Sequence, residues 1–106
     1  MKYILYLALL LSFCGRATEW VYVNDASRLL WQMNTAGTVW FRNIKEFKGT
    51  HTGCCYAYKV DTTTPGGKVV WSTLLAKMAA KEPITLGFPK IGTNESPQAL
   101  SAIGKH

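Results

Sequence analysis

The most regular hydrophobic pattern in the chain spans residues 68–82. Its apolar residues at positions i, i+3, i+4 and i+7 are Trp71, Leu74, Leu75 and Met78. This spacing places them on one face of a helix, and the segment is rich in the good helix formers Ala, Leu, Lys and Met. Pro83 ends the segment because the residue before a proline is disfavoured in the α region. We therefore predict one amphipathic helix, with its apolar stripe packed on strands.

Most other apolar segments alternate with polar residues, as half-buried strands do. Strands are predicted at residues 27–33, 38–44, 54–60, 84–88 and 98–103, with a further short strand or ordered arm at 19–23. Residues 34–37 read Asn-Thr-Ala-Gly, which is turn chemistry, so the first two of the five strands are expected to form a β-hairpin. Residues 45–53 are polar and are expected to form a loop.

Alternation along the hairpin separates a core face from an outer face. The predicted core residues are Leu29, Trp31, Met33, Val39 and Phe41. Trp40 and Arg42 fall on the opposite face, where they are candidate ligand-binding residues. The alternative is a subunit interface, where Trp and Arg are enriched. Tyr56 and Tyr58 share a face with Cys54 and Val60, and are expected in the core or at an interface.

The element order is β-β-β-α-β-β, which indicates a mainly β fold with one α-helix. This is the order of the OB fold, a five-stranded, partly open barrel, and residues 18–106 are expected to form a single OB-like domain. A curled sheet also covers the edges of short strands better than a flat one. The alternative is a plain five-stranded sheet with one helix on a face.

Residues 1–17 are predicted to be a secretory signal peptide, and the protein is expected to be secreted or periplasmic. Lys2 precedes an apolar run over residues 3–13, and Gly15 and Ala17 are small residues at the −3 and −1 positions of a cleavage site. The run is shorter than the ~20 residues needed to span a bilayer. The alternatives are a buried N-terminal element or a lipoprotein anchored at Cys14.

Removal of residues 1–17 leaves 89 residues with ten basic and six acidic side chains, a net charge of +4. The cations are scattered, and no run of five or more Lys or Arg occurs. This distribution argues against a nucleic-acid-binding stripe. The mature chain keeps all four tryptophans, a large aromatic content for its size.

Cys54 and Cys55 are the two cysteines of the mature chain. Neighbours in a strand point to opposite faces, which leaves three alternatives: one buried and one exposed thiol, a disulfide between the two neighbours, or a bridge between chains. Secretion would expose them to oxidising conditions. Two cysteines without companion ligands do not make a zinc site, and no cofactor is expected.

The sequence predicts no enzyme. Its six acids lie on separate predicted elements without a glycosidase-like pair, and no G-x-S-x-G nucleophile signature occurs. The two histidines, His51 and His106, lie in a predicted loop and at the C-terminus. Gly66-Gly67-Lys68 precedes the helix, but its spacing does not match a phosphate-binding loop.

Several residues resemble a known family. Glu19-Trp20 follows the predicted cleavage site, and Val70-Trp71, Leu74-Leu75 and residues 79–86 match a tryptophan-led helix, a short turn and an alternating strand. In these features the chain resembles the secreted B-subunit-like proteins of AB5 toxins, in the branch of the subtilase cytotoxin and typhoid (pertussis-like) toxin B subunits. It is shorter than they are, and Phe41, Arg42 and Asn43 stand where they have a second-strand cysteine, so its disulfide framework differs.

The resemblance implies an OB-type homopentamer that binds cell-surface glycans without catalysis, and a catalytic A subunit as a partner. It also implies that the helix lines a central pore, with Lys77 and Lys81 directed toward it. The candidate oligomer-interface residues are Ser72, Thr73, Ala76, Lys77, Ala80, Tyr56 and Tyr58. The alternative functions are a secreted or periplasmic interaction or inhibitor protein, and an OB-type binder of single-stranded nucleic acid.

Overall fold

The computed structural model describes residues 18–50 and 54–105, and the predicted signal peptide lies outside these ranges. Within these ranges the structure is mainly β with one long helix, α3 (Pro65–Ala80), as predicted. Two short helical segments are η1 (Ala26–Arg28) and α2 (Ile44–Phe47). The strands are β1 (Glu19–Val23), β2 (Trp31–Met33), β3 (Thr38–Phe41), β4 (Tyr58–Asp61), β5 (Ile84–Phe88), β6 (Gln98–Ala99) and β7 (Ala102–Gly104).

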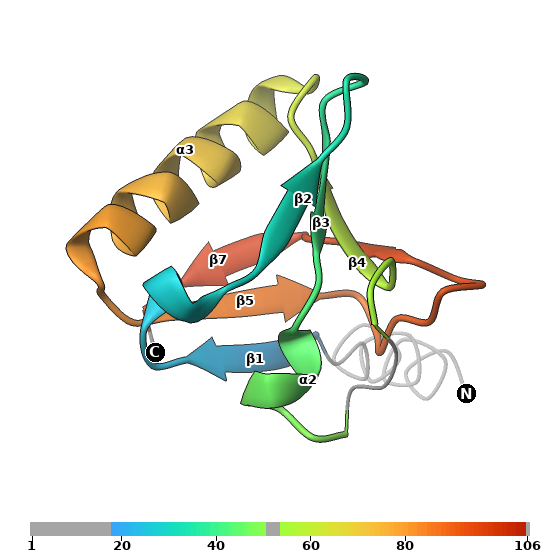
Figure 1. Ribbon diagram of the computed structural model, residues 1–106, viewed down its shortest axis with the longest axis horizontal. Helices are drawn as coiled ribbons and strands as arrows, with labels where there is room; N and C mark the ends of the chain where they lie inside the picture. The colour runs from blue at the N-terminus through green and yellow to red at the C-terminus, as the bar shows by residue number, and fades with distance from the viewer. Residues whose placement is uncertain (1–17, 51–53, 106) are drawn as a thin grey trace, which may run out of the picture.

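These strands form two sheets (Figure 1). The three-stranded sheet has the order β1-β5-β7, and the four-stranded sheet has the order β2-β3-β4-β6. All neighbouring strands are antiparallel except β4 and β6, which are parallel. Residues 19–33 supply β1 to one sheet and β2 to the other, and residues 98–104 likewise supply β6 and β7. Two chain segments therefore link the sheets.

The five-strand OB order predicted from the sequence is not confirmed. Described residues form seven strands, and no closed barrel is found among them. The segment predicted as a strand over 27–33 begins inside η1, because Asp25 caps that turn by accepting a hydrogen bond from the Ser27 N–H at 2.9 Å. The segment predicted over 98–103 breaks where the backbone changes partner: Leu100 N–H donates to Lys59 O, and Ser101 N–H donates to Gly87 O. The arm at residues 19–23 is a strand that pairs with β5 over its whole length.

The loop predicted over residues 45–53 is also partly wrong, because its first residues belong to α2. The side chain of Asn43, at the start of this helix, is buried and fully engaged. Its Nδ2 donates to Arg28 O at 2.9 Å and to Glu46 Oε2 at 3.1 Å, and its Oδ1 accepts from Leu30 N–H at 2.8 Å. This amide therefore ties α2 to the segment between η1 and β2.

One hydrophobic core joins both sheets and α3. Its largest fully buried side chains are Val21, Val23, Val39, Phe41, Tyr58, Leu74, Leu86 and Phe88. All five residues of β5 are buried, although its alternating sequence predicted one exposed face. This strand lies between β1 and β7, and the Trp20 ring covers Gly87 on its outer face.

Helix α3 begins three residues earlier than predicted. Thr64 Oγ1 accepts a hydrogen bond from Gly67 N–H at 3.0 Å, and Pro65 occupies the first turn, where its missing N–H costs nothing. Any side chain at position 67 would overlap the carbonyl oxygen of Asp61. The helix ends at Lys81, whose backbone is left-handed with φ of 55°.

The predicted apolar stripe of the helix is only partly buried. Trp71 and Leu74 are buried and Met78 is half-buried, but Leu75 is 41% exposed. Trp31 and Met33, predicted in the core, are exposed because β2 lies at the edge of its sheet, whereas Leu29, Val39 and Phe41 are buried as predicted. The Trp31 ring meets Trp71 edge-on at 5.0 Å between centroids.

The predicted β-hairpin is confirmed. β2 and β3 pair antiparallel, and Asn34 Oδ1 accepts from the N–H groups of Ala36 and Thr38 at 3.1 and 3.0 Å. Gly37 has φ of +89°, the left-handed conformation that its lack of a Cβ permits.

Candidate functional site

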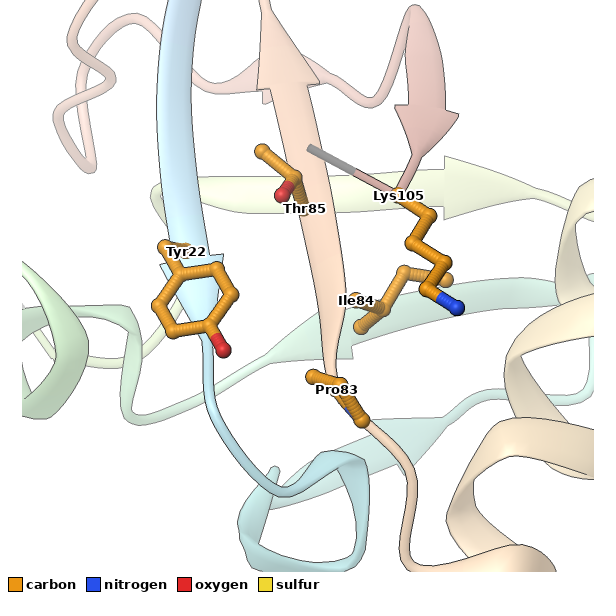
Figure 2. A pocket seen from close by; sticks show the side chains of 5 residues that line it. All are labelled: Tyr22, Pro83, Ile84, Thr85 and Lys105. Atoms are coloured by element: carbon orange, nitrogen blue, oxygen red, sulfur yellow. The ribbon is translucent and has the colours of Figure 1, made fainter.

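Two pockets formed by described residues lie on different parts of the fold. One, of about 180 Å³, lies on the three-stranded sheet and is lined by Tyr22, Pro83, Ile84, Thr85 and Lys105 (Figure 2). The other, of about 390 Å³, adjoins α2 and is lined by Arg42, Asn43, Lys45, Glu46 and Cys54. The second pocket contains Arg42, one of the two residues that the sequence predicts for ligand binding.

Strand β3 directs Trp40 and Arg42 away from the core. Their neighbours Val39 and Phe41 are buried, whereas Trp40 is half-buried and Arg42 is exposed. This is the outcome that the alternation along the strand predicted.

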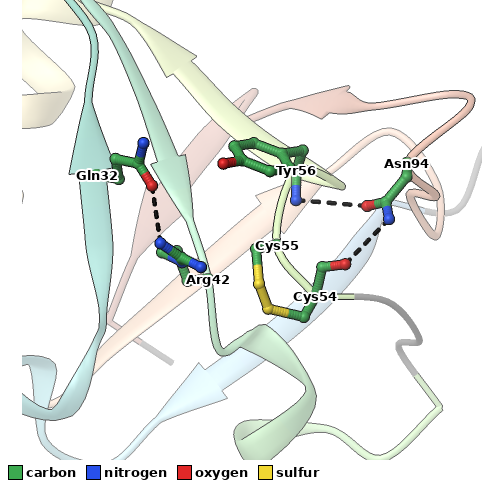
Figure 3. The surroundings of a disulfide bond; sticks show 6 residues. All are labelled: Gln32, Arg42, Cys54, Cys55, Tyr56 and Asn94. Atoms are coloured by element: carbon green, nitrogen blue, oxygen red, sulfur yellow. Dashed lines mark hydrogen bonds between the residues drawn. A yellow bond between two sulfur atoms is a disulfide. The ribbon is translucent and has the colours of Figure 1, made fainter.

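Arg42 is held in place by a polar contact across the hairpin. Its Nη1 donates a hydrogen bond to Gln32 Oε1 at 2.8 Å (Figure 3). Gln32 stands opposite Trp40 in the β2–β3 register, so its side chain lies on the same outer face of the sheet. Alternation along the predicted hairpin places Gln32 on this face, but it does not mark Gln32 as a site residue.

Trp40 is the centre of an aromatic and cationic cluster. The Tyr56 ring meets it edge-on with 5.5 Å between centroids, and Lys59 Nζ lies 5.5 Å from the centre of the Trp40 ring. Lys59 is the direct cross-strand partner of Trp40 on β4. Tyr56 remains 45% exposed, so a hydroxyl-bearing aromatic ring faces solvent beside Trp40.

The two tyrosines do not share a face, contrary to the prediction. β4 begins only at Tyr58, and residues 54–57 form a bend in place of a strand. Tyr58 is 1% exposed, and its hydroxyl accepts a hydrogen bond from Gly92 N–H at 2.9 Å. Burial raises the pKa of this phenol. Tyr58 is therefore a core residue, which is one of the two alternatives predicted for it, and not a candidate for the oligomer interface.

Cys54 and Cys55 are bonded to each other, the second of the three alternatives that the sequence allowed. The loop after β5 fastens this bend: Asn94 Nδ2 donates to Cys54 O at 3.0 Å, and Asn94 Oδ1 accepts from Tyr56 N–H at 3.4 Å (Figure 3). Sequence reasoning missed Asn94 as a site residue, because 38 to 40 positions separate it from its partners.

The charges around this site are mostly positive. Arg42, Lys45 and Lys59 contribute three cations, and Glu46 is the acid that lines the same pocket. One Glu46 oxygen already accepts from Asn43 Nδ2 at 3.1 Å. Among residues 18–50 and 54–105, no three His, Cys, Asp or Glu side chains form a group that could hold a metal ion. His51 and His106 lie outside the described residues.

The helical interface candidates form a separate surface on α3. Ser72, Ala76 and Ala80 are exposed, and Thr73 and Lys77 are half-buried. Thr73 Oγ1 donates to Val69 O at 2.9 Å, and Lys77 Nζ pairs with Glu82 Oε2 at 2.8 Å. In the part of the chain that the structure describes, no helix has the length and apolar character needed to cross a membrane.

Comparisons of the chain with models of protein families, with curated protein sequences and with solved structures find no match.

Proposed function

We propose that this protein binds carbohydrate without catalysis. The binding surface is formed by Gln32, Trp40, Arg42, Tyr56 and Lys59, and we call it the Tyr56 surface. The observation that carries the proposal is that the exposed Tyr56 ring is braced by Trp40, on the same face as the Arg42–Gln32 pair.

This combination matches the chemistry of a sugar. The C–H groups on one face of a pyranose pack on an aromatic ring, and its hydroxyls need directional donors and acceptors at the ring edge. Arg42 offers several N–H donors in a planar array, and Gln32 offers an amide. Because Trp40 and the Arg42–Gln32 hydrogen bond already fix these groups, little side-chain entropy is lost on binding.

The charge of the surface favours acidic over neutral glycans. Arg42, Lys45 and Lys59 outnumber Glu46, and a surface dominated by one sign of charge raises the local concentration of the opposite sign. The preference should weaken as salt screens these exposed charges.

We also propose an OB-type arrangement of the strands. If residues 19–33 and 98–104 each count as one bent strand that serves both sheets, the order becomes β-β-β-α-β-β. Strand pairing then runs around a ring, in which β4 pairs in parallel with the last of the five strands. The resemblance to AB5 toxin B subunits supports the same reading.

Secretion and self-assembly complete the proposal. A bonded cysteine pair suits an oxidising compartment. Ser72, Ala76 and Ala80 give α3 an exposed face of small side chains on which a second copy could pack closely. Several copies in one ring would bind a cell surface far more tightly than one copy, because each later contact is intramolecular.

A glycan array probed with the mature chain, residues 18–106, tests this function. We expect saturable binding to a group of acidic glycans, and loss of that binding in Tyr56→Ala. Trp31→Ala is the matched control, because Trp31 is also an exposed aromatic residue but contacts Trp71 of α3 and lies outside the Tyr56 surface. Absence of any glycan signal, or equal loss in both variants, would contradict the proposal.

A further inference from the structure

The pocket on the three-stranded sheet contains a buried hydroxyl without a partner. Thr85 is the second residue of β5 and is only 4% exposed. Its Oγ1 is buried and makes no hydrogen bond to any other described residue. Buried hydroxyls are normally bonded, and leaving one unbonded destabilises the folded state. A hydrogen-bond partner for this hydroxyl is therefore expected from a bound molecule.

The register of the sheet explains why the pocket opens at Thr85. Its cross-strand partners are Tyr22 on β1 and Gly104 on β7. Gly104 has no side chain to cover this part of the sheet, whereas the Tyr22 ring lines the pocket on the other side of Thr85 (Figure 2). The pocket therefore lies above Thr85, between the small Gly104 and the large Tyr22.

The groups that line the pocket are donors and apolar surfaces. Lys105 brings an ammonium group and Thr85 a free hydroxyl, while Pro83, Ile84 and the Tyr22 ring supply apolar contact. No carboxylate of a described residue lines it. The nearby Glu82 carboxylate, whose pKa is lowered chiefly by Lys77 and more weakly by Lys105, is already paired with Lys77 Nζ at 2.8 Å.

From this arrangement we infer that the pocket binds a small carboxylate with a planar apolar body. One carboxylate oxygen accepts from Lys105 Nζ and the other from Thr85 Oγ1, and the body lies between the Tyr22 ring and Pro83. The volume of about 180 Å³ suits a single ring, since pockets for drug-sized ligands hold ~300–1,000 Å³. This site lies on a different sheet from the Tyr56 surface, so it does not depend on the proposed glycan binding.

Titration of the isotope-labelled mature chain with benzoate, followed by NMR, tests the inference. We expect saturable shifts of the Thr85 and Gly104 amide signals and of the Lys105 side chain. Benzamide, which has the same ring without the negative charge, should bind at least tenfold more weakly. Equal affinity for the two compounds, or shifts that do not saturate, would overturn the inference.

Two pairs of variants separate binding from folding. Thr85→Val removes the hydroxyl and should weaken benzoate binding at least fivefold, whereas Thr85→Ser keeps the hydroxyl and should retain binding. Lys105→Gln should weaken it likewise, and Lys105→Arg should not. Because Thr85→Val also removes an unbonded buried hydroxyl, its Tm should equal or exceed that of the wild type. Wild-type affinity in Thr85→Val would refute the site.

Discussion

The exposed ring of Tyr56 is braced edge-on by the half-buried ring of Trp40, with 5.5 Å between their centroids. Trp40 belongs to β3, whereas Tyr56 belongs to the bend that precedes β4. Two further contacts fix the pair, because Lys59 lies over the Trp40 ring and Asn94 bonds the Tyr56 backbone. The ring that faces solvent is therefore held by residues from β3, β4 and the loop after β5.

Removal of the brace should weaken ligand binding. An edge-to-face aromatic pair contributes ~0.5–1.5 kcal/mol beyond buried area, so Trp40→Ala should lower glycan affinity by a factor of about 2 to 12. Trp31→Ala is the matched control, since Trp31 is 42% exposed and makes the same kind of edge-on ring contact, but with Trp71. Calorimetric titration of both variants with a glycan bound by the wild type measures the difference. Equal affinities in the two variants would contradict the role of Trp40.

The bond between Cys54 and Cys55 can be tested without a ligand. In the native mature chain, Cys54 and Cys55 should resist alkylation until a reductant is added, and the protein should run as one chain on a non-reducing gel. Intact mass after alkylation, with and without reductant, checks this. Two alkylated cysteines without reductant would favour free thiols, and a covalent dimer would favour a bridge between chains.

Tyr58→Phe tests the contact between β4 and the loop after β5. The substitution leaves the Gly92 N–H without the acceptor that it now has at 2.9 Å. An unsatisfied buried donor costs ~1–3 kcal/mol, so urea unfolding should show a lower free energy of unfolding by that amount. Tyr56→Phe is the control and should change stability little, because its side chain is exposed. Unchanged stability in Tyr58→Phe would contradict the buried hydrogen bond.

Two carboxylates should make the fold sensitive to acid. Hydrogen bonds from Ser27 lower the pKa of Asp25, and hydrogen bonds from Thr63 lower that of Asp61. Each contribution is fully present above the unfolded pKa of ~3.9 and is lost as pH falls through the lower folded value. Carboxyl NMR titration should therefore give both residues values below the ordinary range. In Thr63→Ala, the Asp61 value should rise while Asp25 stays unchanged; an Asp61 value that does not move would contradict this cause.

Self-assembly can be tested on the exposed face of α3. Ala76→Trp adds bulk to the small-residue surface without touching the buried Trp71 and Leu74. We expect light scattering to give a multiple of the chain mass for the wild type and a lower mass for the variant, with unchanged far-UV circular dichroism. Lys68→Ala, also exposed on α3, should keep the wild-type mass. A wild-type monomer would refute assembly outright.

Local patterns predicted most of the regular structure. The hairpin, its turn at Gly37 and the strand over residues 84–88 follow from alternation and turn chemistry, and the existence of the long helix follows from its periodicity. The outward direction of Trp40 and Arg42 follows from the same alternation, because Val39 and Phe41 occupy the core. These features depend on neighbours within a few residues.

The missed features depend on distant partners. Trp31 and Met33 are exposed because β2 lies at a sheet edge, which no local pattern reveals. Residues 98–104 break into two strands because the backbone changes partner from β4 to β5. Asn94 joins the site only through contacts across 38 to 40 residues, and the bend at 54–57 separates two tyrosines that strand alternation would place together.

The indole N–H signals of the mature chain test the central claim most directly. The protein contains four tryptophans, so each indole provides a separate NMR probe at a known place in the fold. On titration with acidic oligosaccharides, we predict a saturable shift of the Trp40 signal and no shift of the buried Trp71 signal. A glycan that binds while the Trp40 signal stays fixed would contradict binding at the Tyr56 surface.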